Sequence, residues 1–237
     1  MRVRVSLWPG APPDADAPRG WPLEPRRVTA VAIDVLRATT TLTMAFTHGA
    51  ARVIPVASIE EARAWKARDP QVLLCGERGG LKIPGFDLGN SPSEYGHEAV
   101  RGRTLVFAST NGSLAMRACR GSDERMLGSF VGASALVEAL AGRRFVRIVC
   151  SGREGRFAVE DVACAGWLCA ALAARGATIE GGAARLAQAQ APGDPPGIHA
   201  CLQGSESGRA LRRLGPVFAR DVEFAAQLDR VNQAFAF

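Results

Sequence analysis

The sequence is poor in aromatic residues, which make up 6% of the chain and include a single tyrosine. Its lysines and arginines are mostly scattered and are not interleaved with aromatic side chains, as they would be in a protein that stacks bases. We therefore expect no nucleic acid as a partner. The shortage of aromatic anchors also argues against a large protein-recognition surface.

Long apolar runs are missing as well. No unbroken apolar stretch could cross a membrane, and residues 1–13 lack the apolar core of a secretory signal. These absences predict a cytoplasmic protein that does not contact the membrane. The net charge of +6 instead favours small acidic molecules as ligands. The sequence leaves the oligomeric state open, including a homo-oligomer.

Several common cofactor motifs are also absent. None of the six cysteines forms a Cys-x-x-Cys pair, and the three histidines do not cluster. The glycine-rich turns lack the spacing of dinucleotide and nucleoside triphosphate sites. We therefore expect neither a zinc or redox centre nor NAD or ATP.

The hydrophobic pattern alternates between strands and helices. Apolar runs predict strands at 1–5, 28–33, 52–56, 72–75, 104–109, 125–130 and 145–150. Helices are predicted at 39–48, from Ser58, and at 113–120, 133–141 and 160–175, followed by two short helices in 205–230. This alternation predicts an α/β fold of three α/β/α layers around a largely parallel sheet.

The chain also shows signs of an internal repeat. Leu42, Met44 and Gly49 lie 72 residues before Leu114, Met116 and Gly121, and the flanking strands correspond. We therefore predict two similar halves, residues 1–100 with anion-binding loops and residues 101–237 with C-terminal helices. Segments 9–26 and 181–198 are predicted to be loops.

The first polar cluster follows the strand predicted at 28–33 and opens a helix. Free backbone N–H groups at such a turn bind anions, and hydroxyl donors stand at Thr39, Thr40 and Thr41. Arg37 offers a forked cation for phosphate, sulfonate or carboxylate. Asp34 is placed to hold a metal ion or to act as a nucleophile. The simpler alternative is that Thr39 only caps the helix.

The second cluster, residues 76–92, is a long polar loop after another strand. Arg78 and Lys82 are predicted to neutralise an anion, while Glu77 and Asp87 are hard oxygen ligands suited to magnesium. Asn90 and Ser91 complete the cluster. The alternative is a surface loop held by internal salt bridges, although loops of this length are often functional.

The third cluster corresponds to the first in the predicted repeat. Asn111, Gly112 and Ser113 form either a second anion pocket or an ordinary turn with a serine cap. A fourth cluster ends with Glu160 and Asp161 at the start of a helix. These acids either complement the helix dipole or bind metal.

The fourth cluster also resembles the loop of cysteine phosphatases, because Cys150 and Arg156 have the spacing of its thiolate and arginine. Val149 and Phe157 depart from that pattern. A cysteine at the end of a buried strand is usually a small apolar residue. A cysteine phosphatase remains an alternative, and a non-catalytic anion-binding protein is another.

Taken together, the clusters resemble the 2-phosphosulfolactate phosphatase family. The matching strings are AIDVLRATTT (32–41), GERGGLKIPGFDLGNSP (76–92), STNGS (109–113), GSF (128–130), CSGREGRFAVED (150–161), SGRALRRLG (207–215) and DVEFAAQLD (221–229). The resemblance implies an internally duplicated α/β/α fold. It also implies a Mg²⁺-dependent phosphatase that converts 2-phospho-3-sulfolactate, or a related 2-phospho-2-hydroxy acid, to sulfolactate on the route to coenzyme M.

On this basis we predict Asp34, Arg37 and Glu77 as catalytic residues. The predicted metal ligands are Asp34 and Glu77, with Asp87 and Asp161 behind them. The predicted substrate-binding residues are Thr39, Thr40, Thr41, Arg78, Lys82, Asn90, Ser91, Asn111, Gly112 and Ser113. Asp34 could instead attack phosphorus directly, although Leu36 stands where haloacid-dehalogenase-type phosphatases have a second acid.

Overall fold

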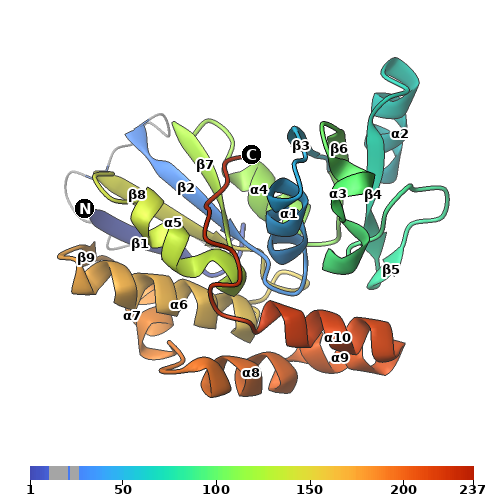
Figure 1. Ribbon diagram of the computed structural model, residues 1–237. Helices are drawn as coiled ribbons and strands as arrows, with labels where there is room; N and C mark the ends of the chain where they lie inside the picture. Colours follow the sequence, from blue (N-terminus) through green and yellow to red (C-terminus); the bar gives the residue numbers. More distant parts are fainter. Residues whose placement is uncertain (11–20, 22–26) are drawn as a thin grey trace.

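The strands of the chain fall into two sheets in the computed structural model, which describes residues 1–10, 21 and 27–237 (Figure 1). Sheet A contains five parallel strands, in the order β7 (Glu124–Gly128), β2 (Thr29–Ile33), β8 (Phe145–Cys150), β1 (Arg2–Ser6) and β9 (Thr178–Ile179). Sheet B has the order β3 (Arg52–Pro55), β6 (Thr104–Ala108), β4 (Leu73–Arg78) and β5 (Leu81–Lys82). Its first three strands are parallel, and β5 runs antiparallel to β4.

Helices cover both faces of sheet A. On one face lie α5 (Ala133–Ala139) and α6 (Val159–Ala174), and on the other lie α1 (Ala38–Thr47) and α4 (Gly112–Ala118). Sheet B packs on the far side of α1 and α4, and α2 (Ile59–Arg68) packs against its outer face. The predicted three-layer α/β/α arrangement with largely parallel strands is therefore confirmed.

The side chains of β2 explain why two helices fit between the sheets. Val31 and Ile33 point toward the core shared with α6, while Ala30 and Ala32 point toward the core that contains α1 and α4. This alternation is the two-residue period of a strand. Because alanine is small, α1 and α4 can approach the sheet closely.

The remaining helices are α3 (His97–Val100), α7 (Gly182–Ala189), α8 (Pro195–Gly204), α9 (Glu206–Leu214) and α10 (Pro216–Ala225), with 3₁₀ turns at Pro92–Glu94 and Phe130–Gly132. The two short C-terminal helices were predicted. Figure 1 shows α9 and α10 side by side below the region between the two sheets. Within the described ranges, no helix has the length and apolar character needed to cross a bilayer.

The prediction of a loop at 181–198 is wrong, because α7 and the start of α8 occupy this segment. The alanines of α7 favour a helix, and the helix packs closely on α6 at Gly166. A Cβ at Gly166 would lie 1.9 Å from the carbonyl oxygen of Ala187. Asp194 caps α8, whose first residue is Pro195, and both are helix-start signals. Most of the predicted 9–26 loop lies outside the described residues.

The two sheets share a topological pattern. The order β7-β2-β8 in sheet A becomes β3-β6-β4 in sheet B when each element is replaced by the one that corresponds to it in the predicted repeat. Such a match is expected of a duplicated chain, and the duplication stays a prediction. The proposed halves 1–100 and 101–237 also stay a prediction, and each sheet takes strands from both.

The C-terminal tail runs along the outer edge of sheet A. Leu127 of β7 donates its N–H to Phe235, and Phe237 donates to Arg125. The Phe235 ring stacks on Phe46 of α1, with centroids 5.6 Å apart. The tail therefore pairs with the edge strand and fixes it to the layer between the sheets.

Candidate active site

A cleft of about 310 Å³ opens where the carboxyl ends of the two sheets meet. This position agrees with the general rule for ligand sites in parallel sheets. Helix α9 closes one side. The lining consists of Asp34, Leu36, Arg37, Glu77, Gly79, Gly80, Asn90, Thr110, Asn111, Arg153, Glu154, Ser207, Ala210, Leu211, Arg213 and Leu214.

Asp34 lies at the end of β2, and its side chain is almost completely buried. Its Oδ1 atom accepts a hydrogen bond from the N–H of Ala38 at 3.3 Å. Its Oδ2 atom faces Gly112, where an added Cβ would lie only 2.5 Å away. Burial, followed by the nearby charge of Glu77, raises the pKa of Asp34 to about 7. The position of the carboxylate is thus fixed, and protein groups compensate its negative charge poorly.

Glu77 reaches the same cleft from β4 of the other sheet. Its two oxygens accept hydrogen bonds from the N–H groups of Thr110 and Gly80, both at 2.8 Å. Each carboxylate oxygen has a second lone pair that remains available to a ligand. The sheets therefore bring together two predicted catalytic acids that are 43 residues apart in the sequence.

Asp161 lies behind Asp34, at the start of α6. Its oxygens accept from the N–H of Val35 at 2.9 Å, the hydroxyl of Ser151 at 2.8 Å and the N–H of Gly152 at 3.0 Å. Burial, then the charge of Asp34, raises its pKa well above the ordinary value. Asp161 does not line the cleft, and these bonds hold the loops that do.

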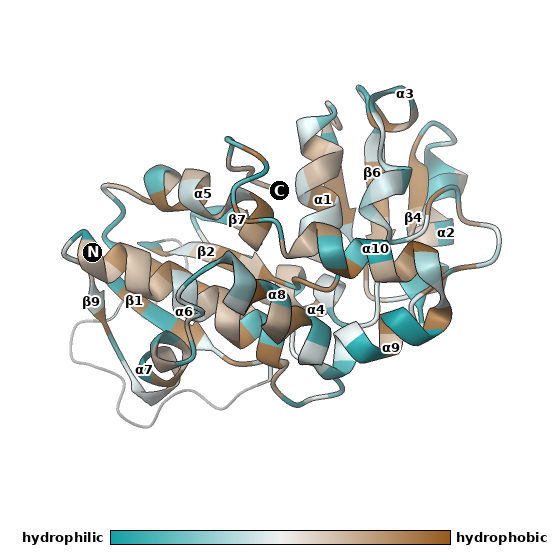
Figure 2. Cartoon of the chain, turned by 60° about the horizontal axis from the view of Figure 1, so that its bottom comes forward, coloured by the Kyte–Doolittle hydropathy of each residue, from teal (hydrophilic) through white to brown (hydrophobic). Residues whose placement is uncertain are grey.

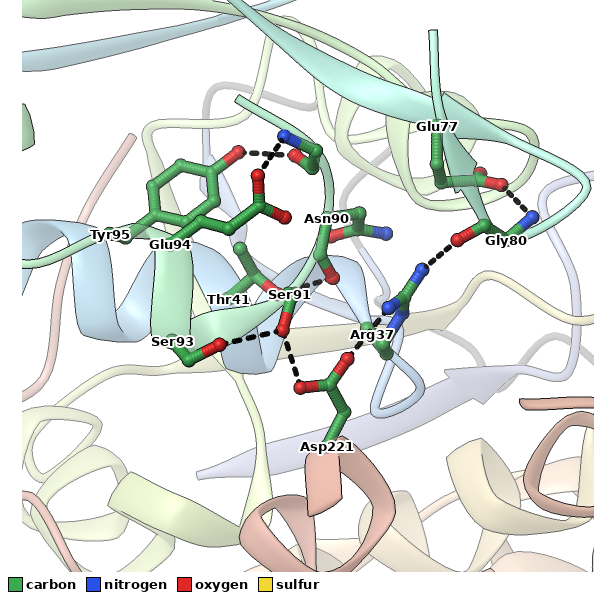
Figure 3. A network of polar contacts seen from close by, with 11 residues as sticks. Arg37, Thr41, Glu77, Gly80, Asn90, Ser91, Ser93, Glu94, Tyr95 and Asp221 are labelled. Atoms are coloured by element: carbon green, nitrogen blue, oxygen red, sulfur yellow. Dashed lines mark hydrogen bonds and ion pairs between the residues drawn. The ribbon is translucent and has the colours of Figure 1, made fainter. Parts of the chain in front are cut away.

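Arg37 is buried and lines the cleft (Figure 3). Its Nη1 atom lies 2.7 Å from Oδ2 of Asp221, and its Nη2 atom donates to the carbonyl oxygen of Gly80 at 2.5 Å. The guanidinium also lies over the ring of Phe218, 5.2 Å from the centroid. The peptide bond between Leu36 and Arg37 is cis. The contacts with Asp221 and Phe218 attach the side chain of the predicted catalytic arginine to α10 (Pro216–Ala225).

Asp221 is the residue of this network that the sequence did not reveal. Its Oδ1 atom accepts a hydrogen bond from Ser91 at 2.5 Å (Figure 3). Burial raises its pKa, while the hydrogen bonds from Ser91 and Arg37 act in the other direction. Nothing in the sequence links Asp221 to Arg37, 184 residues earlier. Arg153 and Arg213, which line the cleft, were likewise not predicted as site residues.

The three predicted threonine donors do not line the cleft. Thr39, Thr40 and Thr41 are fully buried. Their hydroxyls donate, in that order, to the carbonyl oxygens of Gly128, Val35 and Asn90. Since each hydroxyl has only one proton, these bonds fasten the first turn of α1 to its surroundings. The predicted contact with substrate gains no support from this geometry.

Asn90 and Asn111 do line the cleft. The Oδ1 atom of Asn90 is buried and has no hydrogen-bond partner among the described residues. A buried acceptor without a partner is costly, and a ligand donor in the cleft would satisfy it. Ser113, in contrast, is fully buried and donates to the carbonyl oxygen of Phe107.

Three other predicted residues lie outside the cleft lining. Arg78 donates to the carbonyl oxygen of Glu77, and Lys82 is exposed on β5. Asp87 accepts from the N–H of Leu74 and pairs with Lys66 at 3.5 Å. The predicted roles of these side chains in the site gain no support from their positions.

Cys150 is fully buried at the end of β8, and it is absent from the cleft lining. Burial raises its pKa well above the ordinary value, which suppresses the thiolate that nucleophilic attack requires. Arg156, the predicted partner of the thiolate, is exposed. The geometry therefore gives no support to a cysteine phosphatase.

The donor set of the cleft is suited to a hard cation. Asp34 and Glu77 supply carboxylate oxygens, and the pKa of Asp34 is raised by burial and then by the charge of Glu77, both of which a cation would offset. No cluster of three or more histidine, cysteine, aspartate or glutamate side chains suited to a metal occurs among the residues described. Magnesium commonly uses only one or two protein carboxylates, with water and substrate phosphate completing its shell.

Comparison with known proteins gives one consistent result. Residues 17–235 match the family described as 2-phosphosulpholactate phosphatase. Two relatives named probable 2-phosphosulfolactate phosphatase match most of the chain. The one from Deinococcus radiodurans is 40% identical over 233 residues, covering 96% of this chain and 90% of its own. The one from Carboxydothermus hydrogenoformans is 40% identical over 203 residues, covering 85% and 83%.

A relative of the same name from Thermotoga petrophila is 49% identical over 138 residues, which is 58% of this chain. Its match, and that of the relative from Caldicellulosiruptor saccharolyticus, span 60% of the relatives' own length.

Proposed function

Because the chain belongs to the 2-phosphosulfolactate phosphatase family, we propose that it is a Mg²⁺-dependent phosphatase. It hydrolyses 2-phospho-3-sulfolactate, or a related 2-phospho-2-hydroxy acid, to the hydroxy acid and phosphate. The substrate is a small, multiply charged anion, in keeping with the net charge of +6.

The convergence of Asp34 and Glu77 is the observation that carries this proposal. Two buried acids from different sheets face one cleft, and their mutual repulsion helps raise the pKa of Asp34 to about 7. Burying two acids side by side costs stability, and an acid with a raised pKa in a cleft is typical of catalytic sites.

Asp34 and Glu77 are the residues that would hold Mg²⁺. The ion would neutralise phosphoryl oxygens and orient the attacking group, as is general for phosphoryl transfer. The protein itself fixes both carboxylates through main-chain N–H groups: Ala38 holds Asp34, while Thr110 and Gly80 hold Glu77. Asn90 offers a donor on the substrate or on bound water its Oδ1 atom, for which the described part of the chain supplies no partner.

The test measures phosphate release from racemic 2-phospho-3-sulfolactate, with magnesium and with excess EDTA. We expect release that requires magnesium, and a loss of at least about 100-fold in Asp34→Asn and Glu77→Gln. Asp87→Asn is the matched control, since this acid was predicted as a ligand but lies outside the cleft lining. It should retain activity.

Each other outcome has a definite meaning. Release in EDTA would overturn the metal-dependent proposal. No release from any 2-phospho-2-hydroxy acid, combined with thermal stabilisation by these compounds, would identify an anion-binding protein instead.

A further inference from the structure

The charges of the cleft are separated along its depth. Its floor carries Asp34 and Glu77, which are both buried. Its mouth carries Arg153, which is partly buried, and Arg213, which is exposed, together with the exposed Glu154. The third arginine of the lining, Arg37, already pairs with Asp221 at 2.7 Å. The cations able to receive an anionic ligand are therefore at the mouth.

Arg213 lies in the last turn of α9, and its side chain makes no hydrogen bond or ion pair with any residue that the structure describes. The Nε atom of Arg153 lies 3.8 Å from Glu154 and 4.0 Å from Glu206. These separations exceed a normal hydrogen bond, and both glutamates are more than 60% exposed, so the attraction is weak. Both guanidinium groups thus keep free donors.

The surface next to Arg213 is also positive. A shallow groove beside the cleft is lined, among the residues that the structure describes, by Arg209, Arg212, Arg213, Gly215, Pro216 and Ala219, and none of these is an acid. Figure 2 shows strongly hydrophilic turns on α9 in this region. Arg213 lines the groove and the cleft alike. An anion that approaches this face is therefore attracted toward the mouth of the cleft.

We propose that Arg153 and Arg213 bind the second acidic group of the substrate, the carboxylate or sulfonate that is not hydrolysed, and so select phosphate esters that carry such a group. This inference rests on the proposed function, which places the phosphate near Asp34 and Glu77. The planar guanidinium matches the oxygens of either acidic group through paired hydrogen bonds. The cleft then holds the two anionic ends of the substrate at different places, with the phosphate at the floor and the second acidic group at the mouth.

Three esters of secondary alcohols test the assignment. 2-Phospho-3-sulfolactate carries both acidic groups, 2-phospholactate carries only the carboxylate, and isopropyl phosphate carries neither. Arg213→Gln and Arg153→Gln should lower kcat/KM for 2-phospho-3-sulfolactate about 10- to 100-fold, mainly through KM, because one charge-assisted contact is lost. Isopropyl phosphate should change little.

The middle ester identifies the group that is bound. If the variants lose as much kcat/KM on 2-phospholactate as on 2-phospho-3-sulfolactate, the arginines bind the carboxylate. If kcat/KM for 2-phospholactate changes as little as that for isopropyl phosphate, they bind the sulfonate. Arg185→Gln is the matched control, since this exposed arginine of α7 lines neither the cleft nor the groove. Equal losses on all three esters, or no loss on any, would overturn the proposal.

Calorimetric binding of sulfolactate separates this proposal from the proposed phosphatase activity. Sulfolactate lacks phosphate but keeps both acidic groups, so its affinity reports the mouth of the cleft even if no ester is hydrolysed. We expect weaker binding by a factor of about 10 or more in Arg213→Gln and unchanged binding in Arg185→Gln. Equal affinity in wild type and Arg213→Gln, or no binding to wild type, would refute the assignment.

Discussion

Replacing Asp221 with alanine removes the anionic half of a buried ion pair. The side chains of Arg37 and Asp221 are only 2% and 4% exposed, so the charge left on Arg37 would be poorly solvated. Breaking a buried pair on one side costs about 3–5 kcal/mol, because the remaining charge stays buried and uncompensated. The hydrogen bond from Ser91 is lost as well, which adds about 1 kcal/mol.

This loss is a large part of the 5–15 kcal/mol that is typical of a folded domain. Urea unfolding followed by circular dichroism at neutral pH measures it, and Asp221→Ala should shift the midpoint strongly at an unchanged slope. Asp221→Asn should lose less, because the amide oxygen can still accept one hydrogen bond from Ser91 or Arg37.

A double replacement separates stability from activity. Arg37→Met combined with Asp221→Leu removes both charges and should recover much of the lost stability. It should not recover phosphate release if the Arg37 guanidinium acts in the cleft. A loss of less than about 1 kcal/mol in Asp221→Ala would refute the reasoning, because it would be the value of a solvated surface pair.

Three further predictions concern Asp34, Gly112 and Cys150. In metal-free protein, the pKa of Asp34 is raised from 3.8 to about 7, so the folded state retains a proton that the unfolded chain releases. Its contribution to the free energy of unfolding should therefore fall as pH rises from 3.8 to about 7. In urea titrations at several pH values, Asp34→Asn should reduce this decline of the free energy of unfolding with pH, and the variant should not release phosphate. An unchanged decline would contradict the raised pKa of Asp34. Gly112→Ala places a Cβ 2.4 Å from Cβ of Ala38 and 2.5 Å from Oδ2 of Asp34, so both kcat and the melting temperature should fall, by about 1–3 kcal/mol in stability; normal values for both would show that the backbone yields easily. Cys150→Ala should cost only about 1 kcal/mol of stability and should keep phosphatase activity in magnesium, whereas abolished activity in a folded variant would restore the cysteine mechanism.

Local signals in the sequence were enough to predict most of the fold. The apolar run that ends at Asp34 and the helix predicted from Ser58 rest on patterns of neighbouring residues, and both correspond to the structure. The division of the strands between two sheets was not predicted, because strand pairing depends on contacts between distant segments. Periodicity shows that β6 is buried but does not show whether it lies beside β2 or β4.

The same difference applies to the cleft. The rule that ligands bind at strand ends correctly brought Asp34 and Glu77 to one place. It could not reveal Asp221 or Arg213, because both lie on C-terminal helices that are packed across the strand ends by tertiary contacts. The threonines of α1 were predicted to bind substrate but do not line the cleft. Their hydroxyls donate to main-chain carbonyl oxygens instead, which the sequence alone does not show.

The pairing of the tail with β7 has a consequence for self-association. An edge strand with free N–H and C=O groups is a template on which another chain can add a strand. Here Phe235 and Phe237 already satisfy groups of Leu127 and Arg125. A chain shortened to end at residue 234 should therefore expose an unpaired edge strand on β7, and light scattering would detect the aggregates that form on it.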